Sequence, residues 1–324
     1  MNKDINLISQ LNKDWQPRKI KVKRTGGQTN RNYIVHYKNR KFFVRLPWER
    51  TDIVDRKVEA GNILAISKNR RLIGIIPRYF LYIFKKRNVL SLGKRLNFSD
   101  GTVIMEYIKG RDIDGRDLEN NKIQKALLKS LSTFHKSRLR FVNKYDVFRD
   151  EISKYKDKAK KYPIGKLFSE EKIKNIENIE KEAKRNFPLG GKISTHNDLI
   201  FENLFLGKDD KIYLLDFEYA GFNIRNGLYY DLGIILGGNL FQKNPLRIET
   251  FEKILKKAER IYKNKLNKKK IYFGALINIL VMFWWGLIKY FSSKTKKENK
   301  YFKKYVLDRA KRIEELFKIA NRKY

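Results

Sequence analysis

The residues with the clearest chemical potential lie beyond the middle of the chain, in the run 196–199 (HNDL) and at Asn203 and Asp216. Asn203 follows Asp198 by five positions, and Asp216 follows Asn203 by thirteen. Phosphoryl transfer requires such a set, because a carboxylate must stand beside the acceptor hydroxyl and oxygen ligands must hold Mg²⁺ beside the phosphates. A short hairpin between Asn203 and Asp216 would bring both side chains to one metal ion, next to Asp198. The spacing therefore predicts a phosphoryl-transfer site.

The same spacing occurs in protein kinases, whose catalytic loop reads H-R-D-x-x-x-x-N and is followed by D-F-G. Two positions differ here, because Asn197 replaces the arginine and Glu218 replaces the glycine. These differences argue against a protein Ser/Thr kinase and favour a kinase of small molecules. Chance spacing of polar residues on ordinary loops is the competing interpretation, and the apolar runs on both sides weaken it.

The elements that must position these residues begin with a strand-rich segment. Several short runs alternate apolar and polar residues, as half-buried strands do, and residues 55–67 change to helical spacing. A turn at Asn39-Arg40 is expected to join two of the strands as a hairpin. The expected strands are 20–23, 32–37, 41–46, 74–76, 79–84 and 102–107.

The chain after Gly110 reads as mostly helical, with strands only at 203–206 and 211–217. The expected helical segments are 121–137, 151–183 and 251–324. A strand-rich part joined to a helix-rich part predicts two lobes with a cleft between them. We expect an N-terminal nucleotide-binding lobe over 1–107 and a C-terminal catalytic and acceptor-binding lobe over 108–324.

Taken with these elements, the motifs resemble a known family. The runs 196–203 (HNDLIFEN) and 214–221 (LLDFEYAG) resemble choline/ethanolamine kinases of the bacterial choline kinase type, within the wider aminoglycoside phosphotransferase group. Three further runs agree, at 26–30 (GGQTN), 44–47 (VRLP) and 283–287 (FWWGL). The resemblance implies an α+β, bilobal, protein-kinase-like fold and transfer of a phosphate from ATP, with Mg²⁺, to an alcohol.

The resemblance also implies a role for each matching residue of the catalytic segment. Asp198 would be the catalytic base for the acceptor hydroxyl, and His196 would orient the catalytic loop beside it. Asn203 and Asp216 would hold Mg²⁺.

The nucleotide would be bound mainly from the first lobe. Arg45, tethered by Glu59, would contact the ATP phosphates, because a guanidinium pairs bidentately with phosphate oxygens. Glycine tolerates a positive φ, so a Gly-Gly turn would let backbone N–H groups approach the phosphates. The remaining expected nucleotide contacts are Gly26, Gly27, Thr29 and Asn30 in that turn, and Glu106 and Tyr107 at the adenine hinge.

Choline is the first expectation for the acceptor. Its quaternary ammonium offers no N–H group, so its pocket needs aromatic faces and a carboxylate. The expected acceptor-binding residues are Glu218, Tyr219, Tyr230, Asp231 and Trp285. A place in the apolar core is the alternative for the aromatic residues, and Trp284 fits that alternative better than Trp285 does. Ile288 replaces a second tryptophan of the family, so the reaction class is better supported than the acceptor.

Other acceptors and a non-enzymatic function were also weighed. Ethanolamine, thiamine or an aminoglycoside would keep the same reaction, although the segment after Asp216 is poor in the acidic residues that a polycation needs. A basic pseudokinase that binds anionic membrane or nucleic acid is disfavoured, because the base and both metal ligands are present. Preference for ATP over GTP, the oligomeric state and the pathway stay open.

The composition agrees with a nucleotide-using enzyme. The 324 residues are 42% hydrophobic and carry 74 Lys and Arg against 35 Asp and Glu, a formal charge of +39. The lysines are scattered along the chain, whereas a nucleic-acid-binding protein more often concentrates them. We therefore expect no specific nucleic acid partner, although weak contact with anionic membranes is compatible with the charge. The absence of cysteine excludes disulfides and thiol catalysis and agrees with a cytoplasmic location.

One segment is apolar enough to raise the question of a membrane. Residues 271–290 (IYFGALINILVMFWWGLIKY) match a spanning helix in length. Asn278 lies within the segment and lysines flank it on both sides. We expect a buried helix of the C-terminal lobe.

Overall fold

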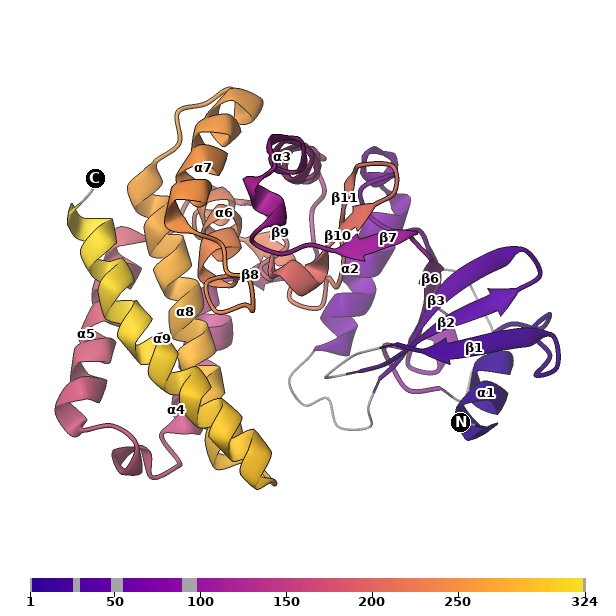
Figure 1. The fold of residues 1–324 in the computed structure, drawn as a ribbon, viewed down its shortest axis with the longest axis horizontal. Coiled ribbons are helices and arrows are strands. Elements are labelled where there is room, and N and C mark those ends of the chain that lie inside the picture. Colours follow the sequence, from indigo (N-terminus) through magenta and orange to yellow (C-terminus); the bar gives the residue numbers. More distant parts are fainter. Residues whose placement is uncertain (1, 26–29, 48–54, 89–97, 323–324) are drawn as a thin grey trace.

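The structure is a computed structural model that describes residues 2–25, 30–47, 55–88 and 98–322. Figure 1 shows a sheet-containing lobe at the N-terminal end and a larger helical lobe that includes the C-terminus. The expected α+β, two-lobed architecture is confirmed. The division expected after Tyr107 falls between β6 (Val103–Glu106), in the first sheet, and β7 (Gly110–Asp112), in the second.

The N-terminal lobe is built on a six-stranded sheet in the order β1-β2-β3-β6-β4-β5, with antiparallel neighbours. Helix α1 (Asn2–Ser9) contributes to the core on one face, and α2 (Arg56–Lys68) packs against β4 near the other. The side-chain carboxylate of Asp55 starts α2, since it accepts hydrogen bonds from the N–H groups of Lys57 and Val58. The other strands are β1 (Ile20–Arg24), β2 (Asn30–Tyr37), β3 (Arg40–Pro47), β4 (Tyr79–Phe84) and β5 (Arg87–Asn88).

Alternation along β3 decides where its charged residue points. Val44 and Leu46 belong to the apolar cluster on the α1 side of the sheet. Because successive side chains of a strand point to opposite faces, Arg45 between them is directed towards α2 and the cleft. A strand register shifted by one residue would bury Arg45 in the apolar cluster instead.

The C-terminal lobe combines two small sheets with seven α-helices of the described chain. The sheets have the orders β11-β10-β7 and β8-β12-β9. Pairing of β9 with β12 places Thr195 opposite Gly221, so the segments that follow Thr195 and precede Gly221 lie side by side. The strands are β8 (Lys144–Tyr145), β9 (Ile193–Thr195), β10 (Leu204–Gly207), β11 (Ile212–Leu214) and β12 (Gly221–Asn223). The longer helices are α3 (Asn121–His135), α5 (Glu170–Asn186), α6 (Gly227–Gly237), α7 (Ile248–Tyr262), α8 (Lys268–Phe291) and α9 (Lys296–Arg322).

Helix α8 contains the long apolar segment and packs against α6, α9, α5 and α4 (Lys154–Ala159) (Figure 1). Among the described residues, α8 is the one helix long and apolar enough to cross a membrane. In its most apolar stretch, however, 83% is buried inside the fold. This burial agrees with the expected core helix.

Three expectations about local structure are wrong. The hairpin turn is at Lys38-Asn39, because Tyr37 pairs with Arg40 and Lys38 takes the left-handed conformation with φ 50°. Residues 74–76 form no strand, since Gly74 has φ 85° and a single bridge joins Ile73 to Ile76. The segment 151–183 is interrupted after α4, where Pro163 cannot continue a helix, and its first residues belong to a π-helix over Phe148–Ser153.

Glycines allow α6 and α8 to cross in close contact. A Cβ atom on Gly233 would lie 2.5 Å from the backbone nitrogen of Ala275, and one on Gly237 would lie 2.5 Å from its carbonyl oxygen. These distances are too short for any side chain, so the crossing requires glycine at both positions unless the helices separate.

We expect Gly233→Ala to lower the free energy of unfolding by about 1–3 kcal/mol, because the added methyl group must push the two helices apart. Gly165→Ala is the matched control, since a Cβ atom there meets nothing within 4 Å. Urea unfolding of both variants tests the prediction, and equal stability of the two would contradict it.

Candidate active site

The catalytic loop 196–203 is fixed by the buried carboxylate of Asp231 on α6. Its Oδ2 accepts from the N–H of His196 at 2.9 Å and its Oδ1 from the N–H of Asn197 at 2.8 Å. His135 on α3 contacts the same Oδ2 through Nε2 at 2.9 Å. Asp231 is 0% exposed, so both oxygens are committed to holding the loop. The expected acceptor-binding role of Asp231 is therefore wrong, because no acceptor can reach it.

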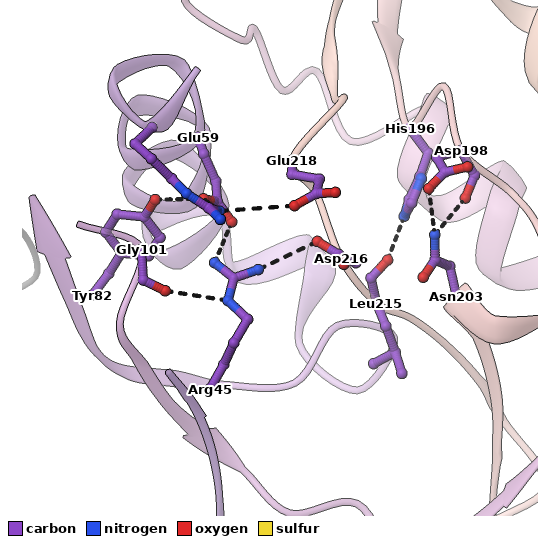
Figure 2. A network of polar contacts seen from close by, with 11 residues as sticks. Arg45, Glu59, Tyr82, Gly101, His196, Asp198, Asn203, Leu215, Asp216 and Glu218 are labelled. Carbon is purple, nitrogen blue, oxygen red and sulfur yellow. Dashed lines mark hydrogen bonds and ion pairs between the residues drawn. The ribbon is translucent and has the colours of Figure 1, made fainter. Parts of the chain in front are cut away.

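Asp198 projects from this loop and is held by Asn203 (Figure 2). The Nδ2 of Asn203 donates to Oδ2 of Asp198 at 2.8 Å and to its backbone carbonyl at 2.9 Å. Burial, together with the nearby carboxylates of Asp216 and Glu151, raises the pKa of Asp198 to about 8, against the hydrogen bond from Asn203. A carboxylate with a raised pKa has a greater affinity for a proton, which suits a general base.

His196 is buried beneath the loop. Its Nε2 donates to the backbone carbonyl of Leu215 at 2.7 Å, and its ring lies 4.7 Å from the ring of Phe217, centroid to centroid. Burial lowers the pKa of His196, which favours the neutral imidazole. Because it is 0% exposed, His196 touches no substrate and positions the loop relative to Asp216. This hydrogen bond fits the loop-orienting role that the resemblance implies for His196.

The hairpin expected between Asn203 and Asp216 is present, and the shared role of the two side chains at a metal ion stays a prediction. Strands β10 and β11 pair as a hairpin, and the N–H of Leu215 donates to the carbonyl of Asn203 at 3.0 Å. Asp216 adopts φ 57°, a left-handed backbone that a non-glycine residue rarely takes. Such strain is typical of functional sites, and here it turns the carboxylate towards the N-terminal lobe.

Arg45 connects the two lobes at this point (Figure 2). Its Nη2 donates to Glu59 on α2, its Nη1 lies 3.4 Å from Oδ1 of Asp216, and its Nε donates to the carbonyl of Gly101 at 3.2 Å. Desolvation works against the charge of Arg45, but Glu59 and Asp216 raise its pKa overall. The structure thus joins Arg45 to Glu59, as expected, and also to one expected metal ligand.

Glu59 is the anchor of this arrangement. Besides Arg45, it accepts from Nη1 of Arg56 at 2.6 Å and from the hydroxyl of Tyr82 at 2.6 Å. Burial would raise its pKa, but the two arginines outweigh burial and lower it. The ionised carboxylate therefore holds the guanidinium of Arg45 in the cleft.

The donor set fits Mg²⁺. Asn203 uses its amide nitrogen on Asp198, so its side-chain oxygen is left for a cation. Asp216 adds a carboxylate whose contact with Arg45 is long at 3.4 Å. Among the described residues no cluster of three or more His, Cys, Asp or Glu could hold a metal. Mg²⁺ uses one or two carboxylates, waters and substrate phosphates, so Asn203 and Asp216 would suffice as the donors from the protein.

The other expected nucleotide contacts are only partly described. Gly26, Gly27 and Thr29 lie outside the described residues. Asn30 begins β2 opposite Pro47. Glu106 ends β6, and Tyr107 follows it with Nζ of Lys41 5.5 Å from its ring centroid. Their contact with adenine stays a prediction.

The expected acceptor residues separate into two groups. Tyr219 lies near Asp198 and shares a hydrogen bond with Tyr155 of α4; Asp198 and Glu151 both influence the pKa of each tyrosine. Glu218 turns the other way, with Oε2 3.8 Å from Nη1 of Arg56, so the structure places it towards the N-terminal lobe. Glu218 also acts on the pKa of Tyr219 and Tyr155, so its expected contact with the acceptor stays a prediction.

Trp285 is half-buried on α8 and packs against rings from α9. Its ring centroid lies 5.7 Å from that of Tyr305 and 5.8 Å from that of Phe302. Burial raises the pKa of Tyr305 to about 12 against the opposing charge of Arg309, and Asp198 is among the groups that contribute to the rise. Arg309 covers one face of Tyr305, with Cζ 3.1 Å from the ring centroid. Trp285 therefore belongs to an aromatic cluster with Tyr305 and Phe302.

Tyr230 and Trp284 are core residues. Tyr230 is 0% exposed and packs between Tyr145 and Phe187, so its expected acceptor role is wrong. Trp284 is also fully buried and donates from Nε1 to Glu180 at 3.1 Å.

Sequence reasoning missed several residues of the site. Asn239 holds the catalytic loop, since its Oδ1 accepts from the N–H of Phe201 at 2.7 Å and its Nδ2 donates to the carbonyl of Leu199 at 3.1 Å. Tyr155 and Tyr305 come from helices that the motif comparison did not reach. A helical projection of 148–159 and 296–322 could have grouped their aromatic faces, but not directed them at Asp198.

We expect Asp231→Asn to lower the free energy of unfolding by about 1–3 kcal/mol, because an amide nitrogen would replace one of two buried acceptors. Asp157→Asn, the same change at an exposed position of α4, should leave stability within about 0.5 kcal/mol. Urea unfolding compares the two, and a stable Asp231→Asn protein would mean that the clamp on the catalytic loop is unimportant.

Comparison with known proteins adds family and fold. A family model described as choline/ethanolamine kinase matches residues 22–313. A probable ethanolamine kinase of Arabidopsis thaliana is 26% identical over 186 residues, which are 52% of this chain and 48% of that protein. The matched region thus spans about half the length of this curated relative.

Solved structures share the fold at low identity. Choline kinase LicA from Streptococcus pneumoniae has a TM-score of 0.70 and 20% identity over 98% of both chains, and its complex with AMP has a TM-score of 0.69, 19% identity and the same coverage. An ethanolamine kinase of Plasmodium vivax has a TM-score of 0.70 and 17% identity, covering 98% of this chain and 87% of its own. Since the family model covers most of the sequence and the fold agrees, the chain belongs to the choline/ethanolamine kinase family.

Proposed function

We propose that this protein is an ATP- and Mg²⁺-dependent kinase that phosphorylates the hydroxyl of choline to give phosphocholine. The observation that carries the proposal is the convergence of Asp198, Asn203 and Asp216 with Arg45 in one cleft. Membership of the choline/ethanolamine kinase family supports a small-molecule alcohol as the acceptor.

The arrangement assigns a task to each side chain. Asp198 would accept a hydrogen bond from the acceptor hydroxyl, orient its oxygen and take up its proton as the new O–P bond forms. Asn203 holds Asp198 in place from the side opposite the open oxygen. Arg45 would move from Asp216 to the phosphates, where a guanidinium stabilises negative charge. Asn203 and Asp216 would hold Mg²⁺, which supplies charge neutralisation at the phosphates when bound.

Choline is preferred because of the aromatic residues on the acceptor side. A quaternary ammonium is recognised by the faces of aromatic rings. Tyr155, Tyr219, Trp285 and Tyr305 come from four different segments; Asp198 acts on the pKa of each of the three tyrosines, and the ring of Trp285 packs against that of Tyr305. The complex of LicA with AMP supports a nucleotide as the second substrate.

Ethanolamine is the second candidate. The matched Arabidopsis thaliana protein is a probable ethanolamine kinase, and a primary ammonium would use the same pocket through N–H groups instead of ring faces. Comparison of kcat/KM for the two acceptors decides between them, since a cation–π pocket favours the quaternary head.

With Mg²⁺ and ATP, we expect turnover on choline above that on ethanolamine, thiamine and kanamycin. Asp198→Asn should lower kcat about 10²- to 10⁴-fold, because it removes the base and keeps the shape. Asp157→Asn, exposed on α4, is the control. Coupled measurement of ADP formation tests this. Turnover on ethanolamine alone would replace choline as the acceptor, and full activity of Asp198→Asn would refute the assigned base.

Removal of divalent ions should abolish turnover, because the phosphate charges would face Asp216 without a cation between them. We expect EDTA to stop ADP formation and excess Mg²⁺ to restore it. Activity that persists in EDTA would contradict the assignment of Asn203 and Asp216 as metal ligands.

A further inference from the structure

We propose that Glu151 is a specificity-determining residue that binds the cationic head of the acceptor. The inference rests on the proposed function and extends it, because it names the charge that selects an amino-alcohol over a neutral alcohol. Glu151 lies within 148–159, a segment that the sequence motifs leave without a role.

Glu151 differs from every other buried carboxylate of the described chain. Five Asp or Glu residues fall in the buried class there. Four of them contact a basic side chain, namely Glu59 with Arg45, Asp146 with Arg225, Glu180 with Lys156 and Asp231 with His135. Glu151 forms no ion pair with any described residue, although it is only 8% exposed. Buried charges normally have a partner, so a cation from outside the chain would complete this site.

The hydrogen bonds of Glu151 satisfy only one of its oxygens. The hydroxyl of Tyr145 donates to Oε1. Among the described residues no group donates to Oε2, and this atom is not sealed from solvent. Burial raises the pKa of Glu151 to about 7, against the hydrogen bond from Tyr145. A carboxylate kept for structure alone would gain from a second donor, whereas this one keeps an oxygen free for a ligand.

The backbone around Glu151 is also unusual. It lies in a π-helix over Phe148–Ser153, which continues directly into α4. Such insertions are rare and are frequent at functional sites, because the widened turn redirects side chains. Tyr155 follows Glu151 by four residues, so the next turn presents it near the same side of the helix.

Glu151 lies close enough to Asp198 for the two carboxylates to interact electrostatically. Glu151 is among the carboxylates that raise the pKa of Asp198, and it also affects Tyr155 and Tyr219. It therefore shares one small region with the base that meets the hydroxyl. Choline and ethanolamine separate hydroxyl oxygen from nitrogen by only two carbons. One molecule can thus place its hydroxyl at Asp198 and its ammonium against Glu151 and the tyrosine rings.

The test separates charge recognition from structural support. Glu151→Gln keeps the shape and removes the charge, so the KM for choline should rise about tenfold or more, which corresponds to about 1.4 kcal/mol of binding. The KM for ATP should stay within about twofold, because the nucleotide contacts lie in the other lobe. Glu151→Asp, which keeps the charge, should recover part of the affinity for choline.

An uncharged probe provides the decisive comparison. 3,3-Dimethyl-1-butanol has the shape of choline with carbon in place of the nitrogen. Its inhibition constant against choline should be the same for the wild-type protein and Glu151→Gln. Tyr145→Phe, which removes the hydrogen bond but leaves the charge, should change the KM for choline by no more than about threefold.

Two kinds of failure can be told apart. An unchanged KM for choline in Glu151→Gln, or equal weakening of choline and 3,3-dimethyl-1-butanol, would overturn the role of Glu151 while leaving the kinase intact. A wild-type protein that turns over neither choline nor ethanolamine would overturn the proposed function and, with it, this inference. Thermal unfolding of Glu151→Gln beside Asp157→Asn verifies that the variant is folded.

Discussion

The contact of Arg45 with Glu59 and Asp216 is the interaction on which the site depends. A buried guanidinium is costly without partners, and here a helix of one lobe and a loop of the other supply them. Glu59 also pairs with Arg56 and Tyr82, so it would keep these two partners if Arg45 turned to a phosphate, as we propose. The contacts of Arg45 thereby link the two lobes at the site.

The region around Asp198 gathers carboxylates although the protein as a whole is basic. The chain carries +39 formally, yet among the described residues no lysine or arginine forms an ion pair with Glu151. The charges next to a site decide which ion it binds, because the electrostatic field of distant exposed lysines is screened beyond about 10 Å at ordinary ionic strength. A basic protein can therefore bind an anionic nucleotide in one half of a cleft and a cationic alcohol in the other.

The sequence alone was enough to predict the placement of site residues that depend on local spacing along the chain. Asn203 and Asp216 flank one hairpin, Asp198 lies in the loop just before it, and the direction of Arg45 follows from the alternation of one strand, so the placement of all four could be predicted. Asp231 and Tyr230 were wrongly assigned to the acceptor site. The direction in which each side chain leaves α6 depends on contacts of that helix with α3 and α8, which no local sequence pattern records. Glu151 and Tyr305 were missed because a π-helix and a helix near the C-terminus, far apart in sequence, bring them to Asp198 only in the folded chain.

The most direct test of the account is the identity of the phosphorylated product. ³¹P NMR of a reaction with ATP, Mg²⁺ and choline should show phosphocholine appearing in step with ADP, and no phosphocholine with Asp198→Asn. Release of inorganic phosphate alone, or ATP left intact with choline and ethanolamine, would contradict transfer to an amino-alcohol hydroxyl at Asp198.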